Sequence, residues 1–322
     1  MSVDENSPQP DITAIVTSYF EEKSLPEFYA QLSDALRGLG RPYEIIMIND
    51  GSTDRTFDIM KELFEKDPNI YAIVDFFKNS GQLAAMTAGA TRARGKAILF
   101  IDSDLQLTPK DLPRLVEKYD EGYDLVSGYR VDRRDSPFRV LPSKIANMIM
   151  RRVSQTTLSD FGCTFKLYNA KILHAFDLGP FKLFNTASVI SRIGRWTEVP
   201  VTHFPRPYGR SGWTFRKLWQ FNMENIVNLS HKPFQLIGGL CLLLAALVAL
   251  RIGIDLVFHI RILSTVTNGL ILNALVISCL ATLGLLCIVG EFTIRGFLLN
   301  QRYPAYIERE CISRQSNGPC SC

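Results

Sequence analysis

Short apolar runs rich in β-branched residues recur about every 25–30 residues along the first 130 positions of the chain. Each run is followed by a longer segment with helical spacing of its apolar residues, which predicts strand–helix–strand units. The predicted strands are Ile12–Thr17, Glu44–Asn49, Ile70–Phe76, Ala97–Ile101 and Asp124–Ser127. The predicted helices are Leu25–Leu39, Thr53–Lys66, Gln82–Ala93 and Pro109–Glu121. We therefore predict an α/β fold with a mostly parallel sheet and helices on both of its faces.

The later part of the chain has a different pattern, with long apolar runs that almost lack charge. Residues 233–310 contain nine charged side chains, and the 29 residues Ile262–Gly290 contain none. A helix needs about 20 apolar residues to cross the hydrocarbon core of a membrane. We therefore predict two transmembrane helices, over about residues 234–258 and 268–292, with Arg251 and Asp255 near the far end of the first. The alternative is a buried hairpin in a soluble core.

The composition of the whole chain does not reveal this division, because its 36 Lys and Arg residues and 32 Asp and Glu residues give an ordinary net charge of +4. The uneven distribution excludes a simple soluble single domain, intrinsic disorder and a polytopic transporter. Basic residues flank both predicted spans, so the positive-inside rule predicts an inner (cytoplasmic) membrane protein with its head and both termini in the cytoplasm. The predicted parts are a polar tail (1–10), an α/β domain (11–212), an amphipathic interfacial helix (213–232), the two spans (233–299) and a cytoplasmic tail (300–322). The interfacial helix has an alternative interpretation as a helix packed on the head.

Carboxylates follow two of the predicted strands, and ligands of α/β sheets bind beyond the carboxyl ends of the strands. The second strand runs into Asp50-Gly51-Ser52, and the fourth into Asp102-Ser103-Asp104-Leu105-Gln106. Asp102 and Asp104 can share Mg²⁺ or Mn²⁺, with Gln106 as a further oxygen ligand, and such an ion usually also takes phosphate oxygens. We therefore predict chemistry on a diphosphate substrate. A D-x-D pair also arises by chance in surface loops, and Asp50 has an alternative role as a helix N-cap.

Basic residues mark two further candidate sites. The stretch Arg130–Arg152 contains seven basic and two acidic residues, which beside a membrane domain predicts a site for a lipid phosphate. The alternative is general attraction to anionic lipids. Arg206 lies in a predicted loop, and its planar guanidinium suits phosphate oxygens; the alternative is a solvated surface charge.

Several motifs together resemble glycosyltransferase family 2, whose members have the GT-A fold and use nucleotide sugars. The first set comprises Ile48–Asp54, Asn79–Gln82 and Asp102–Gln106. Later segments are similar to the polyisoprenyl-phosphate glycosyltransferase branch, namely Gly128–Arg130, Asp135–Arg139 with Ser143 and Asn147, Ser159–Tyr168, His203–Ser211 and Gly290–Tyr306. The resemblance covers roughly residues 11–308. The first strand departs from it, because Thr17-Ser18-Tyr19-Phe20-Glu21 stands where Pro-x-Tyr-Asn-Glu is usual.

This resemblance implies transfer of a sugar from a nucleotide sugar, with UDP as the expected nucleotide, to a polyisoprenyl phosphate of the undecaprenyl type. It implies an inverting, metal-dependent reaction that gives a lipid-linked monosaccharide for modification of cell-envelope glycans. The implied donor-binding residues are Tyr19, Glu21, Asp50, Asp102, Arg206 and Ser211, and the implied metal ligands are Asp102, Asp104 and Gln106. The implied acceptor-phosphate residues are Arg130, Arg139 and Ser143. The implied catalytic residues are Asp104 and Asp160, where Asp160 orients the acceptor or takes a residual proton.

Two other functions stay open at this point. A processive polysaccharide synthase carries Gln-x-x-Arg-Trp, and this chain has Arg192-Ile193-Gly194-Arg195-Trp196. A catalytically silent scaffold of the same fold has no need of the intact Asp102 and Asp104 pair. The expected partners are a nucleotide sugar, a polyisoprenyl phosphate and the lipid bilayer, with a homo-oligomer and a downstream flippase or transferase as further ones, and no nucleic acid.

Overall fold

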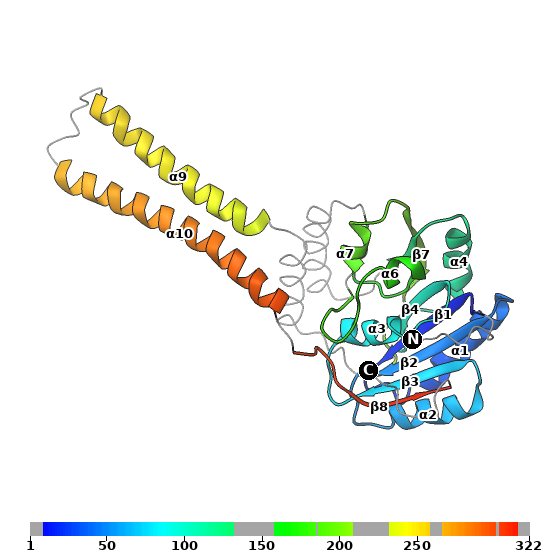
Figure 1. Cartoon of the computed structure of the whole chain (residues 1–322). Coiled ribbons are helices and arrows are strands. Elements are labelled where there is room, and N and C mark those ends of the chain that lie inside the picture. The colour runs from blue at the N-terminus through cyan, green and yellow to red at the C-terminus, as the bar shows by residue number, and fades with distance from the viewer. Residues whose placement is uncertain are drawn as a thin grey trace. The chain divides into compact units, whose positions relative to one another are not determined.

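The computed structural model describes residues 9–131, 158–184, 186–208, 232–257, 266–300 and 303–314 (Figure 1). The chain forms two compact units. One unit, here called the head, comprises residues 1–219 together with 303–322, and the helical unit comprises residues 220–302. The helical unit is therefore inserted in the chain between two parts of the head.

The head is built on one eight-stranded sheet with the strand order β7-β5-β6-β4-β1-β2-β3-β8. The strands are β1 Ile12–Ser18, β2 Tyr43–Asn49, β3 Ile70–Phe76, β4 Ala97–Asp102, β5 Leu125–Val131, β6 Lys166–Asn169, β7 Trp196–Thr202 and β8 Glu308–Ser313. Four pairings are parallel (β1–β2, β1–β4, β2–β3, β5–β7), and three are antiparallel (β4–β6, β5–β6, β3–β8). The predicted mostly parallel α/β sheet is confirmed, and each of the five predicted strands is present.

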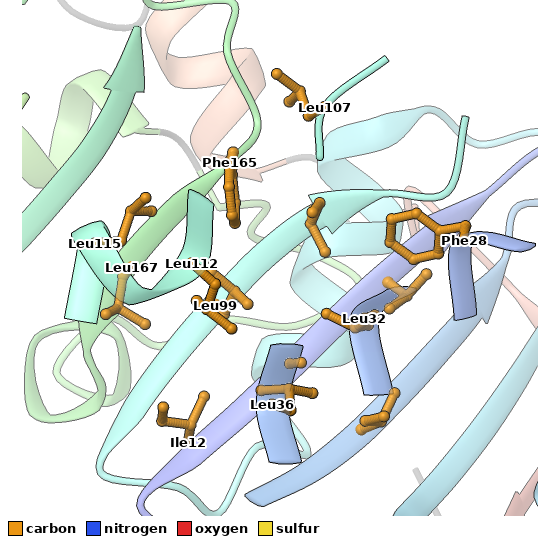
Figure 2. Close-up of a cluster of buried hydrophobic side chains, with 14 of the residues drawn as sticks. Ile12, Phe28, Leu32, Leu36, Leu99, Leu107, Leu112, Leu115, Phe165 and Leu167 are labelled. Atoms are coloured by element: carbon orange, nitrogen blue, oxygen red, sulfur yellow. The ribbon is translucent and has the colours of Figure 1, made fainter. Parts of the chain in front are cut away.

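Helices cover both faces of this sheet, as predicted. They are α1 Leu25–Gly38, α2 Thr56–Lys66, α3 Gln82–Ala90, the 3₁₀ turn η1 Pro109–Asp111, α4 Leu112–Asp120, α6 Ala170–His174 and α7 Thr186–Ile190. The core on one face joins α1, α2 and α4 to Ile12, Ala14 and Val16 of β1, and Figure 2 shows part of it. The core on the other face joins α3, α6 and α7 to Ile15. Alternate residues of β1 thus serve the two cores, because successive strand side chains point to opposite faces.

Helix α3 packs closely on the sheet because six of its nine residues are Ala, Gly or Thr. A Cβ atom at Gly89 would lie 2.4 Å from Cγ2 of Ile15, so a larger residue there would push the helix away from β1. Seven of its residues, from Ala84 to Ala90, are buried. This close packing fixes the start of α3, which carries Gln82, against the ends of the central strands.

Strand β8 covers the free edge of β3 and was not predicted from the sequence. Tyr306 precedes β8 and is buried, with its ring stacked on that of Phe76 at 4.8 Å. Glu308 accepts two hydrogen bonds from Arg92, at 2.8 and 2.7 Å, and Glu310 pairs with Lys61 at 2.8 Å. Part of the tail predicted over residues 300–322 thus contributes a strand to the head.

The helical unit contains α9 Lys232–Val257 and α10 Val266–Asn300, which pack against each other. No helix within the described parts of the chain is long and apolar enough to cross a membrane. The two predicted spans therefore stay predictions. Most of the predicted interfacial helix (213–232) lies outside the described residues, as do Arg139, Ser143 and Ser211.

Candidate active site

The order of the strands places a ligand crevice beyond the carboxyl ends of β1 and β4. The chain runs from β1 to β2 and β3 on one side and then returns to place β4 on the other side of β1. Such a reversal of strand order is where open α/β sheets bind their ligands. Thr17 of β1 and Asp102 of β4 are partners in the parallel register, so the two strands end side by side. The segments 18–21 and 102–106 therefore frame one site.

Asp102 is held at this place by three side chains from different elements. Thr17 Oγ1 donates to Asp102 Oδ1 at 2.5 Å, and Thr164 Oγ1 donates to Oδ2 at 2.8 Å. Gln82 Nε2, at the start of α3, lies 2.9 and 2.7 Å from the two carboxylate oxygens. Burial, and next the charge of Asp104, raise the pKa of Asp102, while these hydrogen bonds lower it. These hydrogen bonds to Asp102 thus fix the end of β4 to β1, to the start of α3 and to the segment that carries Thr164.

Asp104 is buried at the edge of the site, and its carboxylate faces the guanidinium group of Arg206. Leu105 next to it has a φ of 58°, a left-handed conformation that bends the segment sharply. Asp104 Oδ1 accepts a hydrogen bond from the Gln106 amide at 3.0 Å, and Oδ2 lies 2.7 Å from Nη2 of Arg206. The Gln106 carbonyl accepts from the Phe204 amide at 2.8 Å. The loop that carries Arg206 is therefore fixed to the D-x-D segment through the backbone of Gln106.

Arg206 bridges the two strand ends, because its Nη1 also lies 3.4 Å from Oε1 of Glu21. Burial raises the pKa of Glu21 to about 7, although Ser24 and the Arg206 charge act in the other direction. Glu21, Asp104 and Arg206, which the resemblance grouped as donor and metal residues, are thus brought together. The positively charged guanidinium group of Arg206 thus lies between the carboxylates of Glu21 and Asp104.

The donor set suits a hard divalent ion but does not enclose one. Within the described residues, no group of three or more His, Cys, Asp or Glu side chains is arranged to hold a metal. Asp104 Oδ2 faces the guanidinium group of Arg206, and the oxygens of both Asp102 and Asp104 already accept hydrogen bonds. Mg²⁺ and Mn²⁺ are commonly held by one or two carboxylates together with substrate phosphates and water. The carboxylates are of the kind that such an ion prefers, and Asp102, Asp104 and Gln106 as its ligands stay a prediction.

Asp50 organises the loop after β3. Its Oδ1 accepts from the Ser80 amide at 2.6 Å, and its Oδ2 accepts from Asn79 Nδ2 at 2.9 Å and the Gly81 amide at 3.0 Å. The next residue must be glycine, because Gly51 has a φ of +70° and a Cβ there would lie 2.3 Å from the carbonyl carbon of Lys78. Helix α2 begins at Thr56, so the alternative of Asp50 as its N-cap is wrong. A contact of Asp50 with a nucleoside stays a prediction.

Two aromatic residues lie exposed at the end of β1. The rings of Tyr19 and Phe20 meet edge to face, with 4.6 Å between their centroids. Phe20 has a φ of 58°, a left-handed conformation that is costly for a bulky side chain. Its amide donates to Ser52 Oγ at 2.9 Å, which ties the end of β1 to the segment after β2. Strain of this kind persists only where the surrounding contacts impose it.

The residues implied for the acceptor include a buried ion pair. Arg130 Nε lies 2.7 Å from Asp160 Oδ2, and Arg130 Nη2 lies 2.8 Å from Oδ1, which is a two-pronged arrangement. Both side chains are largely buried, at 15% and 11% exposure. The structure thus joins the implied base to the implied phosphate-binding arginine. The resemblance gave Arg130 and Asp160 separate roles, and their pairing was not predicted.

The motif of the alternative polysaccharide synthase lies elsewhere. Trp196 begins β7 and is the register partner of Leu125 at the amino end of β5, whereas Arg130 is the partner of Val201 near the other end. Arg195 donates to the carbonyl of Glu121. The segment 192–196 therefore lies at the opposite end of the strands from Arg130.

Residues 13–176 match the sequence profile described as Glycosyl transferase family 2. The chain is 34% identical over 237 residues to the undecaprenyl-phosphate 4-deoxy-4-formamido-L-arabinose transferase of Salmonella typhimurium, covering 72% of this chain and 71% of that relative. It is 32% identical over 236 residues to the enzyme of that name from Pseudomonas paraeruginosa, covering 72% and 70%. A solved structure of glucosyl-3-phosphoglycerate synthase from Mycobacterium tuberculosis is similar with a TM-score of 0.49 and 18% identity, over 68% of this chain and 77% of that one. From the sequence matches, the chain belongs to glycosyltransferase family 2 and is a glycosyltransferase.

Proposed function

We propose that this glycosyltransferase moves a sugar from a nucleoside diphosphate, with UDP as the expected nucleotide, to a polyisoprenyl phosphate of the undecaprenyl type. The observation that supports this proposal most is a loop, residues 158–165, that contacts both sites. Its Thr164 contacts Asp102, and its Asp160 pairs with Arg130. Strands β4 and β5 both run antiparallel to β6 between them, so their carboxyl ends point the same way. A donor site and a basic acceptor site would thus share one edge of the sheet. The names of the relatives, which specify undecaprenyl phosphate, support this acceptor.

The reaction would be a single displacement at the anomeric carbon of the sugar. A phosphate oxygen of the acceptor forms the new bond to that carbon, the bond to the diphosphate breaks, and the nucleoside diphosphate leaves with the electron pair. The configuration inverts. A divalent ion held by Asp104 and Asp102 would neutralise the charge that develops on the leaving diphosphate. The product is a lipid-linked monosaccharide, which a flippase or second transferase would use next.

The side chains of the protein have separate tasks in this scheme. Arg206 can turn from Asp104 and Glu21 to the diphosphate oxygens, which its guanidinium matches in geometry. Arg130 would hold the acceptor phosphate, and Asp160 would orient Arg130 or take a residual proton. Because the acceptor is already anionic, positioning and electrostatic stabilisation should supply most of the rate enhancement.

We further propose that the two apolar runs predicted as spans, over about residues 234–258 and 268–292, hold the enzyme in the cytoplasmic membrane, with the head in the cytoplasm. The uncharged run Ile262–Gly290 supports this, as do the exposed apolar side chains Leu240, Leu247, Leu275 and Leu286. An enzyme anchored in this way stays in the membrane fraction during alkaline carbonate extraction. Its release into the supernatant would contradict the two spans.

The proposed activity is tested with the purified full-length chain, undecaprenyl phosphate, Mn²⁺ or Mg²⁺ and a panel of UDP-sugars. We expect UDP release together with a chloroform-soluble product that carries one sugar. Asp104→Asn is the matched control, and it should release no UDP. Absence of release from every donor would count against the proposal, and a high-polymer product would favour the polysaccharide synthase. Divalent-dependent UDP binding without turnover would favour the silent scaffold.

A further inference from the structure

The loop that carries Asp160, here called the acceptor loop (residues 158–165), is fixed from three directions. Arg130 holds the Asp160 carboxylate, as described above. Glu198 of β7 accepts hydrogen bonds from the Ser159 amide at 2.9 Å and from the Ser159 hydroxyl at 2.8 Å. Glu198 also lies 3.4 Å from the Asp160 amide. The third contact comes from inside the head, from Lys166.

Lys166 is the first residue of β6 and is buried, with 2% of its surface exposed. Its ammonium group donates to the carbonyl oxygens of Cys163 and of Phe161, the latter at 3.4 Å. Lysine is almost never fully buried unless it is paired, because removing an ammonium group from water is costly. Burial lowers the pKa of Lys166 accordingly. A buried lysine side chain thus donates to two backbone carbonyls of one short loop.

These contacts concern the backbone of the acceptor loop more than its side chains. Amides 159 and 160 meet Glu198, and carbonyls 161 and 163 meet Lys166. At the end of the loop, Thr164 reaches Asp102 of the donor site. A loop held at its backbone on both sides of Asp160 has little freedom to move that carboxylate. Water could satisfy the same groups in an exposed loop without the cost of a buried ammonium.

We infer that Lys166 and Glu198 are positioning residues for the acceptor, which fix the acceptor loop so that Asp160 aligns Arg130 with the acceptor phosphate. This inference rests on the proposed function. The electrostatics agree with it, because Arg130, Lys166, Asp160 and Glu198 form a cluster of two positive and two negative side chains. Loss of one buried member leaves its neighbours without compensation and lets the loop shift.

The test uses the full-length chain and the variant Lys166→Met, which keeps the apolar stem of the side chain and removes its donors. A shift of about 1 Å at a reacting group can cost about a hundredfold in rate. We therefore expect kcat/KM for undecaprenyl phosphate to fall by about a hundredfold, while the Kd of Mn²⁺-dependent UDP binding changes by less than about threefold. The matched control is Lys118→Met on α4, an exposed lysine that pairs with Glu121 at 2.7 Å, and it should change neither quantity.

Two conservative variants keep the test decisive if Lys166→Met does not fold. Glu198→Gln keeps an oxygen acceptor and removes the charge, and Ser159→Ala removes one hydroxyl donor. Both should lower kcat/KM for the acceptor and leave UDP binding in place. Unchanged acceptor kinetics in the folded variants would overturn the inference, and so would an equal loss of UDP binding and turnover. If the unmodified chain binds UDP but transfers no sugar to any polyisoprenyl phosphate, the proposed function fails instead.

Discussion

Glu21 lies buried at the end of β1, and its proton should make the stability of the head depend on pH. Burial raises its pKa from the ordinary value of 4.5 to about 7. An unfolded chain loses this proton above pH 4.5, whereas the folded chain keeps it until about pH 7. The contribution of Glu21 to stability is therefore complete below pH 4.5 and is lost as the pH rises to 7. One pKa unit corresponds to about 1.4 kcal/mol, so the shift amounts to about 3 kcal/mol.

Glu21→Gln should remove this part of the pH dependence, because glutamine is uncharged throughout. The measurement is chemical denaturation of the full-length chain in detergent with EDTA, followed by tryptophan fluorescence at pH 5 and pH 8. The wild-type protein should lose up to about 3 kcal/mol more stability than Glu21→Gln between the two pH values. Asp102 also has a raised pKa and keeps some pH dependence in both proteins. The exposed Glu27 on α1 provides the control Glu27→Gln, which should behave as the wild type. Equal losses in wild type and Glu21→Gln would refute the reasoning.

Three further predictions concern other parts of the head. Asp104→Asn should abolish Mn²⁺-dependent UDP binding in calorimetry with little change in the unfolding temperature. Asp102→Asn should lower stability by about 1–3 kcal/mol, because one of the two oxygens that accept from Thr17, Gln82 and Thr164 is replaced by an NH2 donor. Tyr306→Ala should cost about 3 kcal/mol in denaturant unfolding, while Tyr303→Ala, with 82% of its surface exposed, should cost less than about 0.5 kcal/mol. Phe20→Asn should raise stability by about 1 kcal/mol by relieving the left-handed backbone, and a lower unfolding temperature would contradict this.

The sequence predicts the central sheet well because buried parallel strands leave a local signal. Most residues in each of the runs from Ile12, Ile70 and Ala97 are apolar, and polar residues follow where the strands end. Strand β8 has no such signal, since Glu308–Ser313 is largely polar and its partner β3 is more than 200 residues earlier. Its pairing follows from the free edge of β3 and from contacts of side chains that are distant in the sequence.

The candidate site shows the same division between local and distant information. The carboxylates Asp102 and Asp104 could be predicted from their place after a strand, whereas Glu21 was indicated only by the family resemblance. The roles of Gln82 and Thr164 could not, because their shared contact with Asp102 depends on how α3 and the acceptor loop pack. The burial of Lys166 could not be predicted either, because a lysine side chain is ordinarily expected in solvent.

The place of β8 in the chain has a consequence for biosynthesis. The edge of β3 stays uncovered until residues 308–313 have left the ribosome, and by then both α9 and α10 have been made. An uncovered strand edge can pair with another chain. Synthesis proceeds at about 5–20 residues per second, so the nascent head waits several seconds or longer with this edge open. Newly made chains should therefore depend on chaperones until the last strand is in place.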